Sequence, residues 1–490
     1  MMAQSRTRKV LFLSSGKTLT VFVSLISASI LTRILSQADF GTYRQVMLAY
    51  AFAVPFVLLG FDQALFAFLP GEKERSRGLL VENLLLLTVA GGILSLFIAF
   101  GGGQVLAKRF NNPSLASLLS LMTLYPLFML PASALPACLM VRNRTEQLVV
   151  FNISSRLFMF FVVIIPCFWL PKPSTAVIGN VAGAILTTIV AVFLMFNACK
   201  GSKWEPTWTG LKKQFLFSVP LGLAIIVGTT SISLDQVLVS LRCPPEVFAV
   251  YTVGAIEIPL IGIITGSITS VVLVDYALFY KEKNTKAIVD LIHKAMTRSA
   301  ILILPVMAYL FCIAPELMRL LFGKNYEWSA VPFRIYLLLL PFRTITFGAI
   351  LQATGNSKKI LIASILGLVV NAVLSWPLIG AIGAQGAALG SVLTTYFVGV
   401  PYLTYVIKNI LKSKVAALFP LNNMIKLTII SATPSIIILL LKFKVTLPDI
   451  AWLIVAALIF IPFISTGLRI VKIEDGVDFK GILSSILNRT

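Results

Sequence analysis

The chain has 490 residues, of which 58% are hydrophobic and only 12% are charged, whereas soluble proteins carry about 25% charged residues. With a mean hydropathy of +0.94, this composition excludes a soluble globular protein. The net charge of +22 would suit nucleic-acid binding. However, the basic residues lie in short loops between apolar runs, as membrane topology requires, so we predict no nucleic-acid partner.

The N-terminus begins with basic residues followed by an apolar run, which resembles a signal peptide. Arg6, Arg8 and Lys9 precede that run. Because the run is too long and lacks a small-residue cleavage site, we interpret it as an uncleaved first span.

Apolar runs long enough to cross a bilayer then recur along the whole chain. A helix needs about 20 apolar residues to span the hydrocarbon core. We therefore predict an all-α polytopic membrane protein with about fourteen transmembrane helices, near residues 16–35, 45–69, 79–101, 116–141, 148–170, 175–197, 215–240, 247–279, 299–315, 331–353, 360–380, 385–407, 427–441 and 450–468.

The basic residues between these spans predict the orientation of the chain. Of the 41 lysines and arginines, 28 lie at the N-terminus and in every second loop, and nine lie in the opposite loops, Arg44 among them. The side richer in Lys and Arg is normally cytoplasmic. Both termini are therefore predicted to be cytoplasmic, in agreement with the even number of spans.

Two segments of the chain begin with similar residues, which indicates an internal repeat. Phe40 and Tyr43 lie just before the second span, and Phe248 and Tyr251 lie with the same spacing at the start of the eighth. We predict two six-helix halves in a parallel pseudo-twofold arrangement, as in transporters that work by alternating access, although apolar helices can resemble one another by chance. The predicted domains are residues 1–213, 214–412 and 413–490, the last holding two extra helices and a cytoplasmic tail.

Few charged residues remain inside the spans, and each carries an insertion cost of about 2.5–3.5 kcal/mol. Such residues are expected to face protein or water, so we predict that they line a polar central cavity between spans one, two, seven and eight. Ser and Thr in these spans can instead serve helix packing, and Arg33 can instead be an interfacial anchor. The candidate cavity residues are Arg33, Asp62, Gln63, Arg156, Asp235, Gln236, Glu257 and Arg343; Arg334 is the fourth arginine within a span.

Catalytic chemistry has little support in the sequence. His293 is the only histidine, and the five cysteines are scattered without a CxxC pair, which argues against metal sites, catalytic triads and disulfides. No block of soluble composition offers a separate catalytic domain. We predict no enzymatic activity, no cofactor and no metal.

The segments Leu31–Tyr43 and Leu234–Leu238, together with two six-helix halves plus two helices, resemble the polysaccharide-transporter family. That family includes the O-antigen and capsule repeat-unit flippases and belongs to the multidrug/oligosaccharidyl-lipid/polysaccharide (MOP) flippase superfamily. The resemblance implies translocation of undecaprenyl-diphosphate-linked oligosaccharide across the bacterial inner membrane by alternating access, in lipopolysaccharide, capsule or exopolysaccharide biosynthesis. It leaves open contacts with other membrane proteins of polysaccharide assembly.

The resemblance also implies roles for individual residues. Arginine pairs bidentately with phosphate oxygens, which makes Arg33, Arg156 and Arg343 candidates for the diphosphate. Without nucleotide hydrolysis, the driving force would come from substrate gradients or ion exchange. The carboxylates that could couple protons or sodium are Asp62, Asp235 and Glu257.

Two other functions remain open at this point. A multidrug/toxin extrusion antiporter of the same superfamily would use the carboxylates to hold organic cations. A net positive cavity would favour the flippase and a net negative one the antiporter. A membrane-embedded glycosyltransferase or polymerase would need a large outer loop, and the predicted outer loops do not exceed about fifteen residues.

Overall fold

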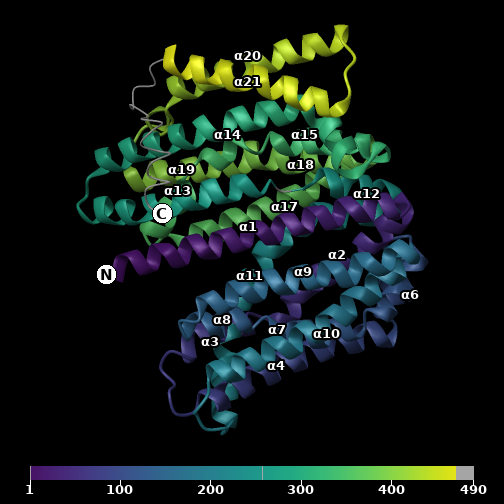
Figure 1. Ribbon diagram of the computed structural model, residues 1–490. Helices are drawn as coiled ribbons and strands as arrows, with labels where there is room; N and C mark the ends of the chain where they lie inside the picture. The colour runs from purple at the N-terminus through teal and green to yellow at the C-terminus, as the bar shows by residue number, and fades with distance from the viewer. Residues whose placement is uncertain (1, 257, 471–490) are drawn as a thin grey trace. The chain divides into compact units, whose positions relative to one another are not determined.

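The computed structural model describes residues 2–256 and 258–470, and all regular secondary structure in that part of the chain is helical. This confirms the predicted all-α fold class. The helices form two compact units, Met1–Ala249 and Val250–Thr490, called here unit 1 and unit 2 (Figure 1). The predicted domain boundaries and the six-helix repeat rest on sequence and stay predictions.

Unit 1 contains eleven α-helices and one π-helical turn, and α12 (Pro245–Gly254) continues into unit 2. The helices of unit 1 are α1 (Met2–Ile34), α2 (Gln37–Leu58), α3 (Phe61–Phe68), α4 (Ser76–Phe97), η1 (Ile98–Gly102), α5 (Gly103–Arg109), α6 (Ser114–Leu121), α7 (Leu124–Ala132), α8 (Leu135–Val141), α9 (Thr145–Trp169), α10 (Pro173–Ala198) and α11 (Trp208–Arg242).

Unit 2 mixes long helices with short 3-10 and π-helical segments. They are α13 (Pro259–Lys281), α14 (Thr285–Phe322), η2 (Lys324–Ser329), α15 (Ala330–Leu337), η3 (Pro341–Thr344), α16 (Phe347–Ala353), α17 (Ser357–Ile382), α18 (Gln385–Thr394), η4 (Thr395–Gly399), α19 (Val400–Leu411), η5 (Val415–Leu418), α20 (Leu421–Lys444) and α21 (Asp449–Ile470).

Ten helices of the described residues are long and apolar enough to cross a membrane, or up to twelve if each of two bent pairs is one span. The chain is therefore a multi-pass membrane protein. The two further predicted spans fall on a shorter apolar helix, Thr18–Ile34, and on α12 and α13, which flank residue 257 outside the described residues. The exact count of fourteen is thus not confirmed.

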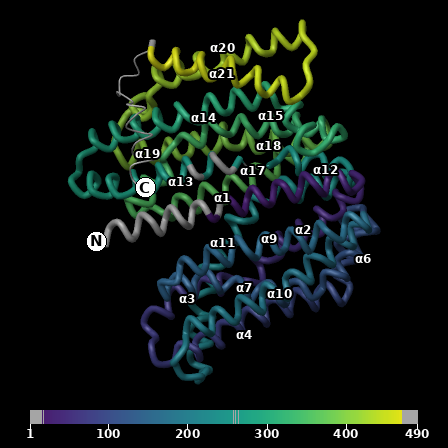
Figure 2. The backbone as a smooth tube through the Cα atoms, in the orientation of Figure 1, coloured from purple at the N-terminus to yellow at the C-terminus, as the bar shows by residue number. Residues whose placement is uncertain are grey.

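The core of unit 1 lies between α4, α7 and α10, which pack side by side (Figure 2). Leu87, Leu130 and Met195 from these three helices are almost fully buried. Membrane helices cannot rely on the hydrophobic effect to associate, so close van der Waals packing of this kind holds them together.

The second span is broken where α2 meets α3, which turn by 45° relative to one another. Leu59 and Gly60 both have positive φ there, 45° and 74°, a conformation that glycine adopts without steric cost. α11 packs closely against this bend, since a Cβ on Gly222 would come within 2.3 Å of the Leu59 carbonyl carbon. The bend therefore determines where α3 begins, and with it the position of Asp62 in the first turn of that helix.

A buried carboxylate joins α4 to the start of α11. Glu82 is 1% exposed, and its Oε1 accepts hydrogen bonds from Arg75 Nη1 and the Thr207 backbone N–H, both at 2.6 Å. Gln214 Nε2 donates to Oε2 at 3.2 Å. Buried charges are tolerated only when paired and hydrogen-bonded in this way.

In unit 2, α20 and α21 lie side by side along α14. Ion pairs between charged residues near the helix ends connect the three helices. Arg319 at the end of α14 contacts Asp449 of α21 at 2.6 Å and Glu327 at 2.7 Å, and Lys442 of α20 contacts Glu316 at 2.7 Å.

Arg319→Ala should loosen this three-helix junction. The side chain is 22% exposed, so solvent screens part of the attraction, and we expect a loss of about 1–2 kcal/mol. Thermal unfolding of the purified protein in detergent measures the loss. Lys444→Ala is the matched control, because Lys444 is exposed at the end of α20. Equal midpoints for the two variants would show that the ion pairs do not hold the junction.

Candidate binding cavity

Unit 1 contains two adjoining hollows of about 140 and 590 Å³, called here the small and the large hollow. α1, α2, α9 and α10 contribute to both, and α7 contributes to the large one. The six residues that line both hollows are Ser24, Tyr43, Arg44, Arg156, Met159 and Asn180. The two hollows therefore form one cavity.

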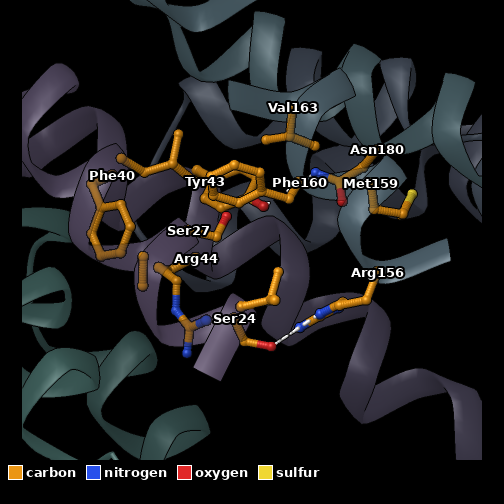
Figure 3. A pocket seen from close by; sticks show the side chains of 13 residues that line it. Ser24, Ser27, Phe40, Tyr43, Arg44, Arg156, Met159, Phe160, Val163 and Asn180 are labelled. Atoms are coloured by element: carbon orange, nitrogen blue, oxygen red, sulfur yellow. Dashed lines mark hydrogen bonds between the residues drawn. The ribbon is translucent and has the colours of Figure 1, made fainter. Parts of the chain in front are cut away.

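Arg156 extends into the cavity from α9 and is held there by α1. Its Nε donates to Ser24 Oγ at 3.0 Å, and its Nη2 donates to the same oxygen (Figure 3). Ser24 Oγ in turn donates to the Thr20 carbonyl at 2.7 Å. No carboxylate takes part in these contacts, so no negative charge offsets the positive charge that the guanidinium presents to the cavity.

Arg44 adds a second guanidinium from α2, on the other side of Ser24 (Figure 3). The side chain is half-buried and has no ion pair within the described part of the chain. A half-buried cation without a counter-ion is costly in a membrane protein and usually marks a functional site.

The sequence predicts Arg44 in the loop before the second span, and this prediction is wrong. The predicted span begins at residue 45, whereas α2 begins at Gln37. Ser36 caps the helix, accepting a hydrogen bond from the Asp39 backbone N–H at 3.1 Å. A Ser-x-x-Asp pattern before an apolar run is a helix-start signal, so Ser36 and Asp39 could have revealed the correct boundary.

Tyr43 and Asn180 supply neutral hydrogen-bonding groups beside the arginines. Asn180 Nδ2 donates to the Tyr43 hydroxyl at 3.1 Å and to the Ala176 carbonyl at 2.8 Å, so it links α2 to α10. Sequence reasoning missed both residues. Asn180 carries no local signal that distinguishes it from other polar residues in spans.

The charge of the cavity is positive. Both hollows, within the residues that the structure describes, are lined by Arg44 and Arg156 and by no Asp or Glu. Low-dielectric walls strengthen the field of such unpaired charges. The arrangement suits an anion that offers several acceptor oxygens, because guanidinium groups bind carboxylate and phosphate in forked pairs.

Of the candidate residues predicted from sequence, Arg156 lines the cavity. Asp62 and Gln63 lie in the first turn of α3, where Gln63 Nε2 donates to Asp62 Oδ2 at 2.5 Å. Arg33 lies in the last turn of α1, and Asp235, which is buried, lies with Gln236 in α11. The structure does not bring these five residues into either hollow. Their roles stay predictions.

The two remaining candidates belong to unit 2 of the chain. Arg343 lies in η3, within the second bent span. Glu257 lies outside the described residues.

Several solved structures are similar to this chain over most of its length. The chain is similar to the lipid II flippase MurJ in its inward closed conformation, with TM-score 0.75 and 18% identity over 94% of this chain and 98% of that one. It is also similar to an inward-facing multidrug resistance MATE family transporter of the MOP superfamily, with TM-score 0.64 and 14% identity over 82% of this chain and 99% of that one.

A third similar structure is a MOP superfamily transporter from Pyrococcus furiosus, with TM-score 0.56 and 14% identity over 83% of this chain and 97% of that one. At these identities the likeness shows the fold, which is that of the MOP superfamily. No curated protein matches the chain.

The sequence itself shows the family. Residues 30–331 match the family model described as "Polysaccharide biosynthesis protein", a segment that covers α2 through η2 and therefore includes Arg44 and Arg156 but not Ser24 of α1. The resemblance predicted from the sequence is confirmed, and the chain belongs to the polysaccharide biosynthesis protein family, with the fold of MOP superfamily transporters.

Proposed function

We propose that the protein is a flippase that moves an undecaprenyl-diphosphate-linked oligosaccharide across the bacterial cytoplasmic membrane by alternating access. The cargo would be a repeat unit of O-antigen, capsule or exopolysaccharide. The observation that carries this proposal is the cavity in unit 1, lined by Arg44 and Arg156 and, within the described residues, by no Asp or Glu.

The cargo's chemistry matches such a cavity. A diphosphate and its sugars cannot cross hydrocarbon unaided, because moving charged and polar groups out of water is costly. Two guanidinium groups can replace the water around the phosphate oxygens with charge-assisted hydrogen bonds. The polyprenyl chain would stay in the bilayer while the headgroup passes through the protein. None of these steps makes or breaks a covalent bond, so we propose a transporter and no enzyme.

Ion coupling is part of the proposal, with Asp62, Asp235 and Glu257 as candidate carriers. Asp62 has the strongest support. Its Oδ1 is buried and has no hydrogen-bond partner in the described part of the chain, and it follows the bend between α2 and α3. A buried carboxylate oxygen without a partner favours protonation or cation binding.

The orientation follows from the loop charges. We propose that both termini face the cytoplasm, because 28 of the 41 lysines and arginines lie on that side in the predicted topology,. The direction of transport would then be from the inner to the outer leaflet of the inner membrane.

A multidrug cation antiporter is the second candidate, since a MATE transporter shares the fold. Organic cations bind most favourably beside acidic groups, and within the described residues neither hollow is lined by Asp or Glu,. A cavity whose charges are Arg44 and Arg156 would repel such a ligand,. The polarity of the cavity therefore favours the lipid-linked anion.

Deletion of the gene tests the proposal. We expect an undecaprenyl-diphosphate-linked oligosaccharide to accumulate in the inner leaflet, measured by extraction of radiolabelled lipid intermediates. The full-length gene should restore export, and the same gene with Arg44→Gln should not. Loss of cationic-dye efflux without any accumulated lipid intermediate would instead support the antiporter.

A further inference from the structure

Arg334 is a half-buried arginine of α15 in unit 2, so the cavity in unit 1 does not account for it. We propose that Arg334 is a positioning residue, which replaces a backbone hydrogen bond that Pro315 cannot make in α14 and thereby holds the second bent span against that helix. This role does not depend on the identity of the cargo. It distinguishes Arg334 from the arginines that are proposed to bind phosphate.

Pro315 interrupts the hydrogen-bond pattern of α14. In a helix each backbone N–H donates to the carbonyl four residues earlier, and proline has no N–H to donate. The Phe311 carbonyl, four residues before Pro315, therefore lacks its usual helical partner. A backbone carbonyl without a partner is costly inside a membrane, and a side chain of a neighbouring helix can satisfy it.

Arg334 supplies the missing donor from α15. Its Nε donates to the Phe311 carbonyl at 2.9 Å, and its guanidinium carbon lies 5.3 Å from the centre of the Phe311 ring, within the range of a cation–π contact. Arg334 forms no ion pair within the described part of the chain. Its hydrogen bond and its ring contact are both made with the residue whose carbonyl Pro315 leaves free.

The next carbonyl of α14 also receives a cationic side chain. Lys442 of α20 donates from Nζ to the Cys312 carbonyl at 2.8 Å and to Glu316 Oε2 at 2.7 Å. Two consecutive carbonyls before Pro315 are thus bonded by cations from two different helices. Hydrogen bonds with a charged donor are stronger than neutral ones, so the interrupted turn of α14 is held from α15 and from α20.

A second proline in α14 shows that this capping is specific to the turn before Pro315. Pro305 lies ten residues earlier in the same helix, and the carbonyl that it leaves free is that of Ile301. Among residues 2–256 and 258–470, no side chain donates to the Ile301 carbonyl. The bond from Arg334 is therefore not a general feature of the prolines in this helix.

The Arg334 bond connects the second bent span to α14. α15 packs beside α14 (Figure 1) and belongs to the segment Lys324–Thr344, which turns by 42° relative to Phe347–Ala353. Arg343, a phosphate-binding candidate from the sequence, lies in η3 of the same segment. The bond therefore fixes the part of unit 2 that contains Arg343.

A double-mutant cycle on the full-length protein tests this role. Arg334→Leu should raise the unfolding equilibrium constant in mixed SDS micelles about tenfold, equivalent to about 1.4 kcal/mol, because it leaves the Phe311 carbonyl without a donor. In the Pro315→Ala background the same change should raise the constant less than about twofold, because alanine restores an N–H at position 315. A carbonyl oxygen accepts two hydrogen bonds, so Pro315→Ala alone should not displace Arg334.

Two further variants are the controls. In the Pro305→Ala background Arg334→Leu should keep its tenfold effect, because the two prolines lie about 15 Å apart along the helix and changes at that separation are additive. Arg334→Gln is the conservative variant, since glutamine Nε2 occupies the same place along the side chain as arginine Nε and remains a donor without the charge. It should stay within about twofold of the wild-type constant and keep the wild-type rate of export.

The positioning role is disproved if Arg334→Leu has the same effect in the wild-type and Pro315→Ala backgrounds. It is also disproved if Arg334→Gln is stable but lowers export as Arg44→Gln should, because the charge of Arg334 would then act on the cargo. If Arg334→Leu does not accumulate in the membrane, its recovery by Pro315→Ala supports the role, and no recovery contradicts it. Unchanged export in Arg44→Gln would count against the proposed function and leave the result of the cycle intact.

Discussion

We expect Arg44→Gln to lower export of the lipid-linked oligosaccharide about a hundredfold while the amount of protein in the membrane stays the same. Removing one charge of a desolvated charge pair typically costs about 2–5 kcal/mol, and a hundredfold effect corresponds to about 2.8 kcal/mol. The fold should tolerate the change, because Arg44 has no ion pair in the described part of unit 1. Pulse-labelled export in cells that lack the chromosomal gene measures the effect.

Arg109→Gln is the control for that experiment. Arg109 is exposed in the last turn of α5 and lines neither hollow, so its loss removes a positive charge from unit 1 without touching the cavity. Export close to the wild-type rate in both variants would show that the charge of the cavity does not act on the cargo.

The second large effect is expected at Glu82, on stability. Glu82→Ala would leave Arg75 and the Thr207 backbone N–H without their acceptor at 2.6 Å. Breaking a buried ion pair costs about 3–5 kcal/mol, and we expect the lower end because Arg75 is 22% exposed,. The result would be a lower unfolding midpoint in detergent and less protein in the membrane.

Glu146→Ala provides the comparison, since Glu146 is an exposed carboxylate in the first turn of α9. We expect its unfolding midpoint to stay within the error of the wild-type value, because exposed charges contribute little to stability. Indistinguishable midpoints for Glu82→Ala and Glu146→Ala would mean that the Glu82 network does not stabilise the junction of α4 and α11.

The positions of the helices could largely be predicted from the sequence, because a bilayer demands long apolar runs and these are visible residue by residue. Helix ends are harder to locate in the sequence, since a helix can begin in polar residues. Arg44 is the clearest case. The first two turns of α2, residues 37–44, contain several polar residues and therefore do not look like part of an apolar span. The bend at Leu59 and Gly60 was also not predicted, because it depends on the packing of α11 against it.

The candidate site was less accessible to sequence reasoning than the fold. A charged residue such as Arg156 stands out in an apolar helix, so it was predicted as a cavity residue and lies in a cavity. Asn180 looks like any other polar residue in a span, and its place in the cavity, where it donates to the Tyr43 hydroxyl at 3.1 Å, depends on how α2 and α10 pack. Single neutral polar residues of this kind become candidates only when the tertiary structure is known.

Transport by the purified protein in proteoliposomes tests the central claim most directly. Vesicles would contain an undecaprenyl-diphosphate-linked oligosaccharide in one leaflet and, in a parallel set, an internal cationic dye. The proposed function predicts that the lipid-linked oligosaccharide changes leaflet, as detected by a membrane-impermeant lectin, and that the dye gradient is unaffected. Movement of the dye without movement of the oligosaccharide would contradict it.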